Sequence, residues 1–143
     1  MKVNTQNNPI QLSLSIIEKA ASPNGFVASL DDNENYNRIW TRDAMITSIA
    51  VLCQEKKSLY PVVKKSITTI ISQIHQDGWV PSNICFGDDG SNPIVSYGGP
   101  VGRIDNVFWL LIGGIYYMEM SDDLSLKDTL YKLADKQLKI TTS

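Results

Sequence analysis

Residues 58–76, SLYPVVKKSITTIISQIHQ, decide the fold class, because their composition and their periodicity point to different structures. The stretch is rich in isoleucine and valine, which are common in strands. Its apolar residues nevertheless recur every three to four positions over about five turns. They are Val62, Val63, Ile67, Ile70, Ile71 and Ile74. Sustained periodicity of this kind predicts a helix.

Four other segments show helical spacing, and no stretch shows convincing strand alternation. They are residues 10–21, a segment starting near residue 41, one starting near residue 105, and residues 123–139. The segment from residue 105 is apolar over most of its surface, which predicts burial on several sides. We therefore predict an all-α chain of helical hairpins, with at least four long helices and no three-stranded sheet.

The totals fit one soluble domain and exclude several classes of protein. The chain has 143 residues, of which 43% are hydrophobic and 20% charged, and its net charge is −2. It has no basic stripe for a nucleic acid, no apolar run of about 18 residues for a membrane, and no signal-peptide pattern. The single histidine and two cysteines do not form a metal-ligand pattern. We expect Cys53 and Cys85 to be buried thiols in a reducing cytoplasm.

The segment Arg38-Ile39-Trp40-Thr41-Arg42-Asp43 is the strongest local signal for chemistry. Trp40 offers a flat apolar face to a sugar ring, Asp43 accepts hydrogen bonds from hydroxyl groups, and Arg42 donates several. The alternative is structural: Thr41 or Asp43 caps a helix and Trp40 packs against it.

A second signal is the glycine-rich stretch from Val95 to Gly102, which ends in Arg103-Ile104-Asp105. Again an arginine and an aspartate stand at the start of an apolar helix, and a helix cap is again the alternative. If the two helices run parallel, both pairs lie on one rim. The long break at residues 77–104 also contains Trp79, which we expect to wall a pocket, although a packed loop explains it equally.

These residues resemble the six-hairpin α/α-barrel glycosidases, a group that includes glucoamylases, the amylo-1,6-glucosidase part of glycogen debranching enzymes and neutral invertases. Residues 39–43 are similar to the Trp-x-Arg-Asp segment at the start of an inner helix in that group. The resemblance implies that Arg42 and Asp43 hold the sugar at the cleaved bond, with Trp40 beside them. Residues 23–36, and residues 96–105 with Tyr97, also resemble the debranching-like branch.

The resemblance covers roughly residues 12–120 and leaves the role of Asp105 open. It implies either the general acid, as in neutral invertases, where Trp109 fits the spacing, or a sugar ligand with Arg103 as its partner. Asn106 and Val107 depart from the invertase pattern, which weakens the case for an acid and for sucrose. A proton donor here needs a raised pKa from burial against Trp109.

The chain is expected to form a single incomplete α/α-barrel domain over residues 1–143, the N-terminal part of a glycosidase cleaving α-glucosidic bonds. Five predicted helices fall short of the family's twelve, and no segment matches its base, so the chain alone is expected to be inactive. No cofactor is implied. The alternatives are a non-catalytic carbohydrate-binding or interaction module and a helical scaffold without a ligand. The Leu126, Leu130 and Leu133 stripe predicts self-association through exposed apolar faces.

Overall fold

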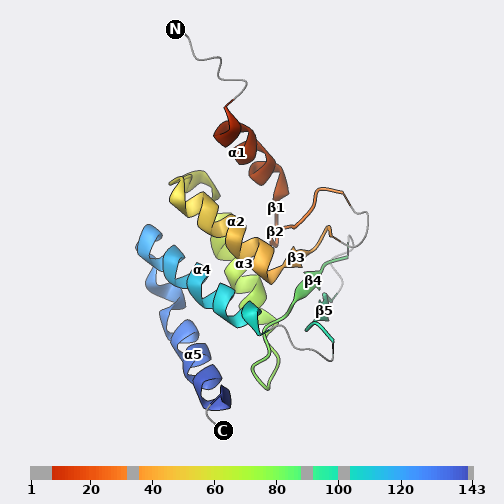
Figure 1. Cartoon of the computed structure of the whole chain (residues 1–143), viewed down its shortest axis with the longest axis vertical. Helices are drawn as coiled ribbons and strands as arrows, with labels where there is room; N and C mark the ends of the chain where they lie inside the picture. The colour runs from red at the N-terminus through yellow and green to blue at the C-terminus, as the bar shows by residue number, and fades with distance from the viewer. Residues whose placement is uncertain (1–7, 32–35, 88–91, 100–103, 142–143) are drawn as a thin grey trace.

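The computed structural model describes residues 8–31, 36–87, 92–99 and 104–141, and for residues 140 and 141 it describes the backbone alone. Within these ranges it contains five α-helices and five short strands (Figure 1). The helices are α1 (Pro9–Ala20), α2 (Thr41–Cys53), α3 (Tyr60–Ser72), α4 (Asp105–Ser121) and α5 (Lys127–Thr141). The strands are β1 (Ala21–Ser22), β2 (Gly25–Phe26), β3 (Ile39–Trp40), β4 (Asn83–Cys85) and β5 (Ile94–Ser96).

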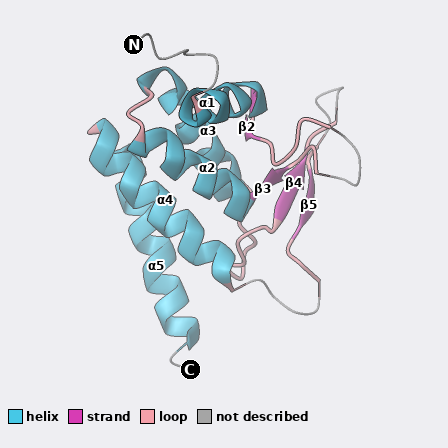
Figure 2. Ribbon diagram, turned by 45° about the horizontal axis from the view of Figure 1, so that its top comes forward, coloured by secondary structure: helices cyan, strands magenta, loops and turns pink. Residues whose placement is uncertain are grey.

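The prediction of an all-α chain made only of barrel hairpins is wrong. Strands β3, β4 and β5 form a three-stranded antiparallel sheet, and β1 pairs with β2 in a second, two-stranded one. The larger sheet lies at one side of the helices, as Figure 2 shows. Each strand has only two or three residues, too few for alternation to be visible in a sequence. The domain is therefore mixed, with helices and two small sheets.

The five predicted helices are present, with their ends shifted by a few residues. The contested segment at residues 58–76 is a helix from Tyr60 to Ser72, preceded by a 3₁₀ turn at Lys57–Leu59. A second 3₁₀ turn, Leu124–Leu126, delays the start of α5. Pro61 stands in the first turn of α3, where its missing N–H costs no intrahelical hydrogen bond.

Helices α2 and α4 run parallel and side by side, and two contacts at opposite ends of the helices fix this arrangement. Arg42 contacts Asp105 at the start of both helices, and Cys53 contacts Tyr116 near the end of α2. Between these contacts, α4 has no side chain at Gly113 and Gly114. A Cβ atom at Gly113 would lie 2.7 Å from Met45 Sδ on α2, and one at Gly114 would lie 2.6 Å from Leu130 Cδ1 on α5. The glycine pair therefore lets α4 pack closely against a helix on each side.

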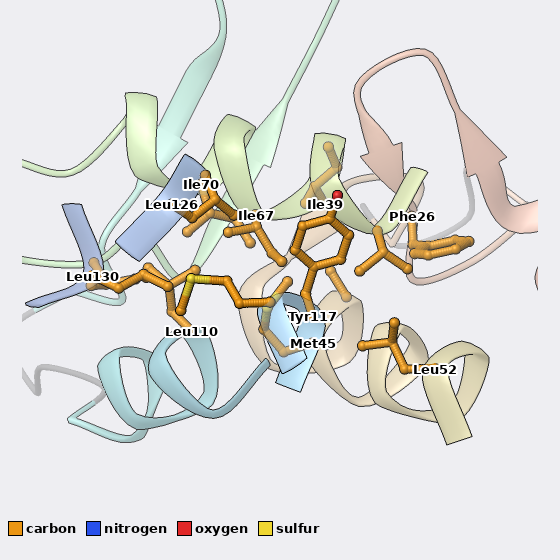
Figure 3. Packing of buried hydrophobic residues seen from close by; sticks show 14 of the residues in the cluster. Phe26, Ile39, Met45, Leu52, Ile67, Ile70, Leu110, Tyr117, Leu126 and Leu130 are labelled. Atoms are coloured by element: carbon orange, nitrogen blue, oxygen red, sulfur yellow. The ribbon is translucent and has the colours of Figure 1, made fainter. Parts of the chain in front are cut away.

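The hydrophobic core lies where α2, α3, α4 and α5 meet, and the sheets close one side of it (Figure 3). Its fully buried members include Phe26 from β2, Ile39 from β3, Met45 from α2 and Leu110 from α4. The predicted exposed stripe of Leu126, Leu130 and Leu133 is instead buried, with side chains 2–7% exposed. The expectation that this stripe drives self-association is therefore wrong.

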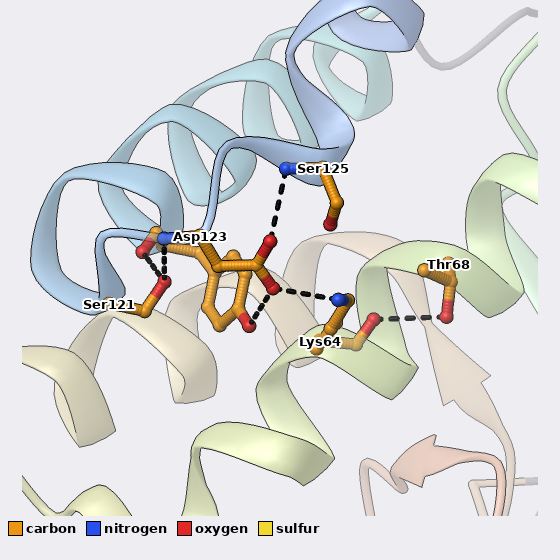
Figure 4. Close-up of polar contacts among 6 residues, drawn as sticks. Lys64, Thr68, Ser121, Asp123 and Ser125 are labelled. Atoms are coloured by element: carbon orange, nitrogen blue, oxygen red, sulfur yellow. Dashed lines mark hydrogen bonds and ion pairs between the residues drawn. The ribbon is translucent and has the colours of Figure 1, made fainter.

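Asp123 ties α3 to the connection between α4 and α5 (Figure 4). Lys64 Nζ of α3 lies 2.7 Å from Asp123 Oδ2, and the Tyr117 hydroxyl donates to the same oxygen at 2.9 Å. The backbone N–H of Ser125 donates to Asp123 Oδ1 at 3.0 Å. The hydrogen bond from Lys64, with those from Ser125 and Tyr117, holds the pKa of Asp123 well below its usual 3.8.

The β1–β2 turn sits directly on α3 because Gly25 has no side chain. Gly25 has φ +128°, and a Cβ atom there would lie 2.8 Å from the Cα of Ser66. The Ser66 hydroxyl accepts a hydrogen bond from the Phe26 N–H at 2.9 Å. At this contact the backbone of the turn lies against the backbone of α3. A backbone atom cannot move aside as the end of a flexible side chain can.

Replacing Gly25 with alanine should lower the free energy of unfolding by about 2–4 kcal/mol, because it adds a steric clash to an unfavourable φ. The measurement is urea unfolding followed by circular dichroism. Gly99→Ala is the matched control, since Gly99 has φ +72° but, among the described residues, no atom within 4 Å of an added Cβ. It should cost only about 1 kcal/mol. Equal losses in the two variants would show that the contact with Ser66 is not close.

Asp123→Asn should destabilise the protein at neutral pH and make little difference at low pH. Because the folded pKa of Asp123 lies below 3.8, the unfolded chain binds more protons at acid pH. The stabilisation is therefore present above about pH 4 and fades as the pH falls through the folded pKa. Thermal unfolding at pH 7, 5, 4 and 3 measures the difference between the variant and the parent.

Asp135→Asn serves as the control for Asp123→Asn. Asp135 forms a pair with Lys139 four residues further along α5, and both side chains are largely exposed. Exposed pairs of this kind contribute little, so this variant should unfold close to the parent temperature at every pH. A constant difference between Asp123→Asn and the parent from pH 7 to pH 3 would contradict the assignment.

Candidate functional site

Three stretches that carry candidate residues meet at the N-terminal end of α2. The Thr41 hydroxyl donates to the Pro81 carbonyl at 2.6 Å, and the Thr41 N–H donates to the Ser82 carbonyl at 3.0 Å. In the three-stranded sheet Trp40 pairs with Asn83, which in turn pairs with Ser96. The sheet therefore holds residues 81–83 and strand β5 next to the Trp-Thr-Arg-Asp segment.

The starts of α2 and α4 are joined by a contact between opposite charges. Arg42 Nη1 lies 3.4 Å from Asp105 Oδ2, and the side chains are 48% and 44% exposed. The expectation that the two helices start on one rim is thus confirmed for these two residues. The expected partner of Asp105 was Arg103, which lies outside the described residues. Asp105 is also favoured electrostatically in the first turn of α4.

In the part of the chain that the structure describes, neither helix start has the capping hydrogen bond that the structural alternative requires. The N-cap residue of α2 is Trp40 and that of α4 is Ile104, and neither makes a side-chain cap hydrogen bond. Thr41, one of the two proposed caps of α2, is fully buried and donates to a loop carbonyl instead. Capping therefore does not account for Arg42 and Asp105, which remain exposed to solvent and in contact with each other.

The other predicted residues near this pair are aromatic or acidic. Trp40 is half-buried and stacks on Tyr36, with ring centroids 5.6 Å apart and planes at 24°. Trp109 is half-buried one turn after Asp105, so the two share a face of α4. Asp43 is exposed in the first turn of α2. Hydrogen-bonding groups and flat rings thus lie along one end of the helix pair.

Tyr97 is directed to the end of α3 and not to the Arg42–Asp105 pair. Its hydroxyl donates to the Gln73 carbonyl at 2.8 Å, and its ring meets His75 edge-on at 5.6 Å. Trp79 belongs to the turn after α3, where its carbonyl accepts from the His75 N–H, and its side chain is 54% exposed. These contacts place both residues in the loops beside the site.

Arg38 is a member of the site region whose structural role the sequence did not predict. Its guanidinium donates to Asn83 Oδ1 at 3.2 Å and so links the segment before α2 to strand β4. The pairing of β3 with β4 creates this contact, and a contact across 45 residues of chain leaves no mark in local periodicity. The contact lies just before α2, the helix that carries Arg42.

The prediction of buried thiols is wrong. Cys53 is exposed and Cys85 is half-buried, and both are free. The Cys53 Sγ lies 3.6 Å from the Tyr116 hydroxyl, and this hydrogen bond raises the pKa of Tyr116.

Within the described ranges, no three His, Cys, Asp or Glu side chains form a group that could hold a metal ion. The helices of that part are all too short or too polar to cross a membrane.

No protein-family model matches the chain, and no curated protein matches its sequence.

Proposed function

We propose that this chain is the sugar-binding N-terminal part of a glycoside hydrolase that acts on α-glucosidic bonds, of the glucoamylase or debranching type. The observation that carries the proposal is the contact between Arg42 and Asp105, at 3.4 Å and accessible to solvent. A guanidinium group donates several hydrogen bonds and a carboxylate accepts them, so together they match two neighbouring hydroxyl groups of a sugar. The resemblance of residues 39–43 to glucoamylase-like enzymes supports the same assignment.

In this proposal Asp105 is a sugar ligand rather than the general acid. A proton donor at neutral pH needs an environment that disfavours its charged form, usually burial. The Asp105 side chain is 44% exposed and beside a positive charge. This exposed position beside a positive charge favours the second candidate function for the chain on its own, a non-catalytic carbohydrate-binding module. Two free thiols suit a reducing compartment, and we place the protein in the cytoplasm.

Arg42→Met should weaken binding of glucose, maltose or maltotriose by about tenfold or more, because hydrogen bonds to charged groups contribute about 1.5–3 kcal/mol. Asp105→Asn should weaken binding by a similar factor. Asp43→Asn should also weaken binding, because Asp43 is predicted to accept hydrogen bonds from sugar hydroxyl groups. Isothermal titration calorimetry on the 143-residue chain measures all three. Lys132→Met, an exposed change on α5, is the control for altered net charge.

Hydrolysis distinguishes the two candidate functions. Release of glucose from maltose, maltotriose, isomaltose and sucrose by the chain alone should stay at background. Turnover that Asp105→Asn abolishes would instead make Asp105 the acid of a complete active site. Folded parent protein that binds none of these sugars would reject both functions.

We also propose that the protein associates with a second copy of itself, through a different surface from the leucine stripe. This surface, the α2/α4 face, consists of Ile46, Phe108, Ile112 and Ile115, whose side chains are 47–54% exposed. Helix α2 has no charged residue from Ala44 to Gln54, and α4 has none from Asn106 to Met118. An uncharged face can meet its own copy without repulsion, and two such pairs form a four-helix bundle.

The size of the α2/α4 face predicts a weak dimer. Four half-exposed apolar side chains are enough to mark an interaction surface, but they are few beside the about 20–30 residues that each partner contributes to a standard interface. Sedimentation velocity should therefore show a dimer only at micromolar concentrations and above. Ile112→Lys should leave the protein monomeric. Leu138→Lys, at an equally exposed leucine of α5, is the matched control and should not.

A further inference from the structure

A groove lies between α3 and the ends of strands β4 and β5, and it shares no residue with the Arg42–Asp105 pair. It is open to solvent and offers about 370 Å³, a volume within the range of small-molecule sites. The antiparallel register pairs Cys85 with Ile94, so Phe86 and Pro93 stand one step beyond the last strand pair. The β1–β2 turn contributes Asn24 to the lining.

The two walls of the groove differ in chemistry. Phe86 and Pro93 form an apolar wall, and the facing wall is a stripe of polar residues along α3. The stripe consists of Lys65, Thr68, Thr69, Ser72 and Gln73, spaced so that they share one side of a helix. A pyranose ring has the same two-sided character, with C–H bonds that lie against flat apolar groups and hydroxyl groups at its edge.

The polar wall retains hydrogen-bonding capacity. Thr68 donates to the Lys64 carbonyl and Ser72 to the Thr69 carbonyl. The Ser72 oxygen also accepts from Gln73 Nε2 at 3.3 Å, which leaves one acceptor site on Ser72 and two on Thr68. Among the residues that the structure describes, the side chains of Asn24 and Lys65 make no hydrogen bond or ion pair. The groove therefore offers both donors and acceptors, as a hydroxyl-rich ligand requires.

The walls are held in place before any ligand binds. Gly25 rests on the backbone of Ser66, and this contact fixes the turn that carries Asn24. Phe86 packs against the hydrophobic core. Prepositioned groups lose little conformational entropy on binding.

We infer that this groove is a second carbohydrate site, which binds a neutral glucose unit or a short glucoside independently of the Arg42–Asp105 pair. A phosphate group is a poorer fit, because anion sites gather several cations or backbone N–H groups. The groove has one lysine as its only cation among the described residues, and it faces the side of α3, where the backbone N–H groups are already bonded within the helix. The choice of a glucose unit as the ligand rests on the proposed function, whereas the groove and its two walls do not.

The test is NMR titration of the chain carrying Arg42→Met and Asp105→Asn, so that the first site is disabled. Glucose and maltose should shift the amide signals of residues 65–73 and 86, and inorganic phosphate should not. Thr68→Val, which keeps the side-chain shape, should weaken binding about fivefold or more in this background. Phe86→Ala should do the same, and Thr68→Val keeps the test decisive if Phe86→Ala does not fold.

Thr47→Val, at a half-buried position of α2 outside the groove, is the control for Thr68→Val. Saturable shifts at residues 65–73 that Thr68→Val weakens and Thr47→Val leaves unchanged are the expected result. No sugar-induced shift in the background variant, shifts caused by phosphate alone, or sugar shifts insensitive to Thr68→Val would each overturn the inference. Loss of all binding with Arg42→Met would leave the proposed function standing and reject the groove.

Discussion

The close packing of α4 between α2 and α5 is the contact on which the other features depend. Met45 of α2 occupies the space beside Gly113, and Leu130 of α5 occupies the space beside Gly114. A larger residue at Gly113 would need Met45 to move, and one at Gly114 would need Leu130 to move. Helix α4 is thereby held against α2, and the Arg42–Asp105 contact lies at the start of the same helix pair. The close packing at Gly113, about two turns beyond Asp105, thus accompanies the contact of the charged pair.

The helices could be predicted from the sequence and the sheets could not, and the reason is length. Segments of twelve residues or more, such as α1 and α3, repeat their apolar positions often enough to be recognised. Strands β3, β4 and β5 are too short to show a repeating pattern of apolar residues. Strand β3 also pairs with β4, which lies about 45 residues further along the chain. The sheet is specified by the burial of Ile39 and Ile84 within the finished core.

In the candidate site, too, the features that depend on the helices were predictable from the sequence and those that depend on the sheet were not. The sequence identified Arg42 and Asp105 because both stand at the start of an apolar helix, and the parallel helices bring them together. It did not identify Arg38 with Asn83, or the buried position of Thr41, because both depend on the sheet. The leucine stripe of α5 was recognised as apolar, but periodicity does not tell which of several apolar faces finds a partner. That partner is α4, and the unpartnered face lies on α4 and α2.

The pairing of β3 with β4 has a kinetic consequence. These strands are separated in the chain by α2 and α3, so they can meet only after the two helices have folded back on each other. Contacts between distant segments form late, since loop closure must precede them. Few hydrogen bonds hold such short strands, and local opening begins where protection is weakest. The amide protons of the rim that carries Arg42 should therefore exchange faster than those of the helical core beneath it.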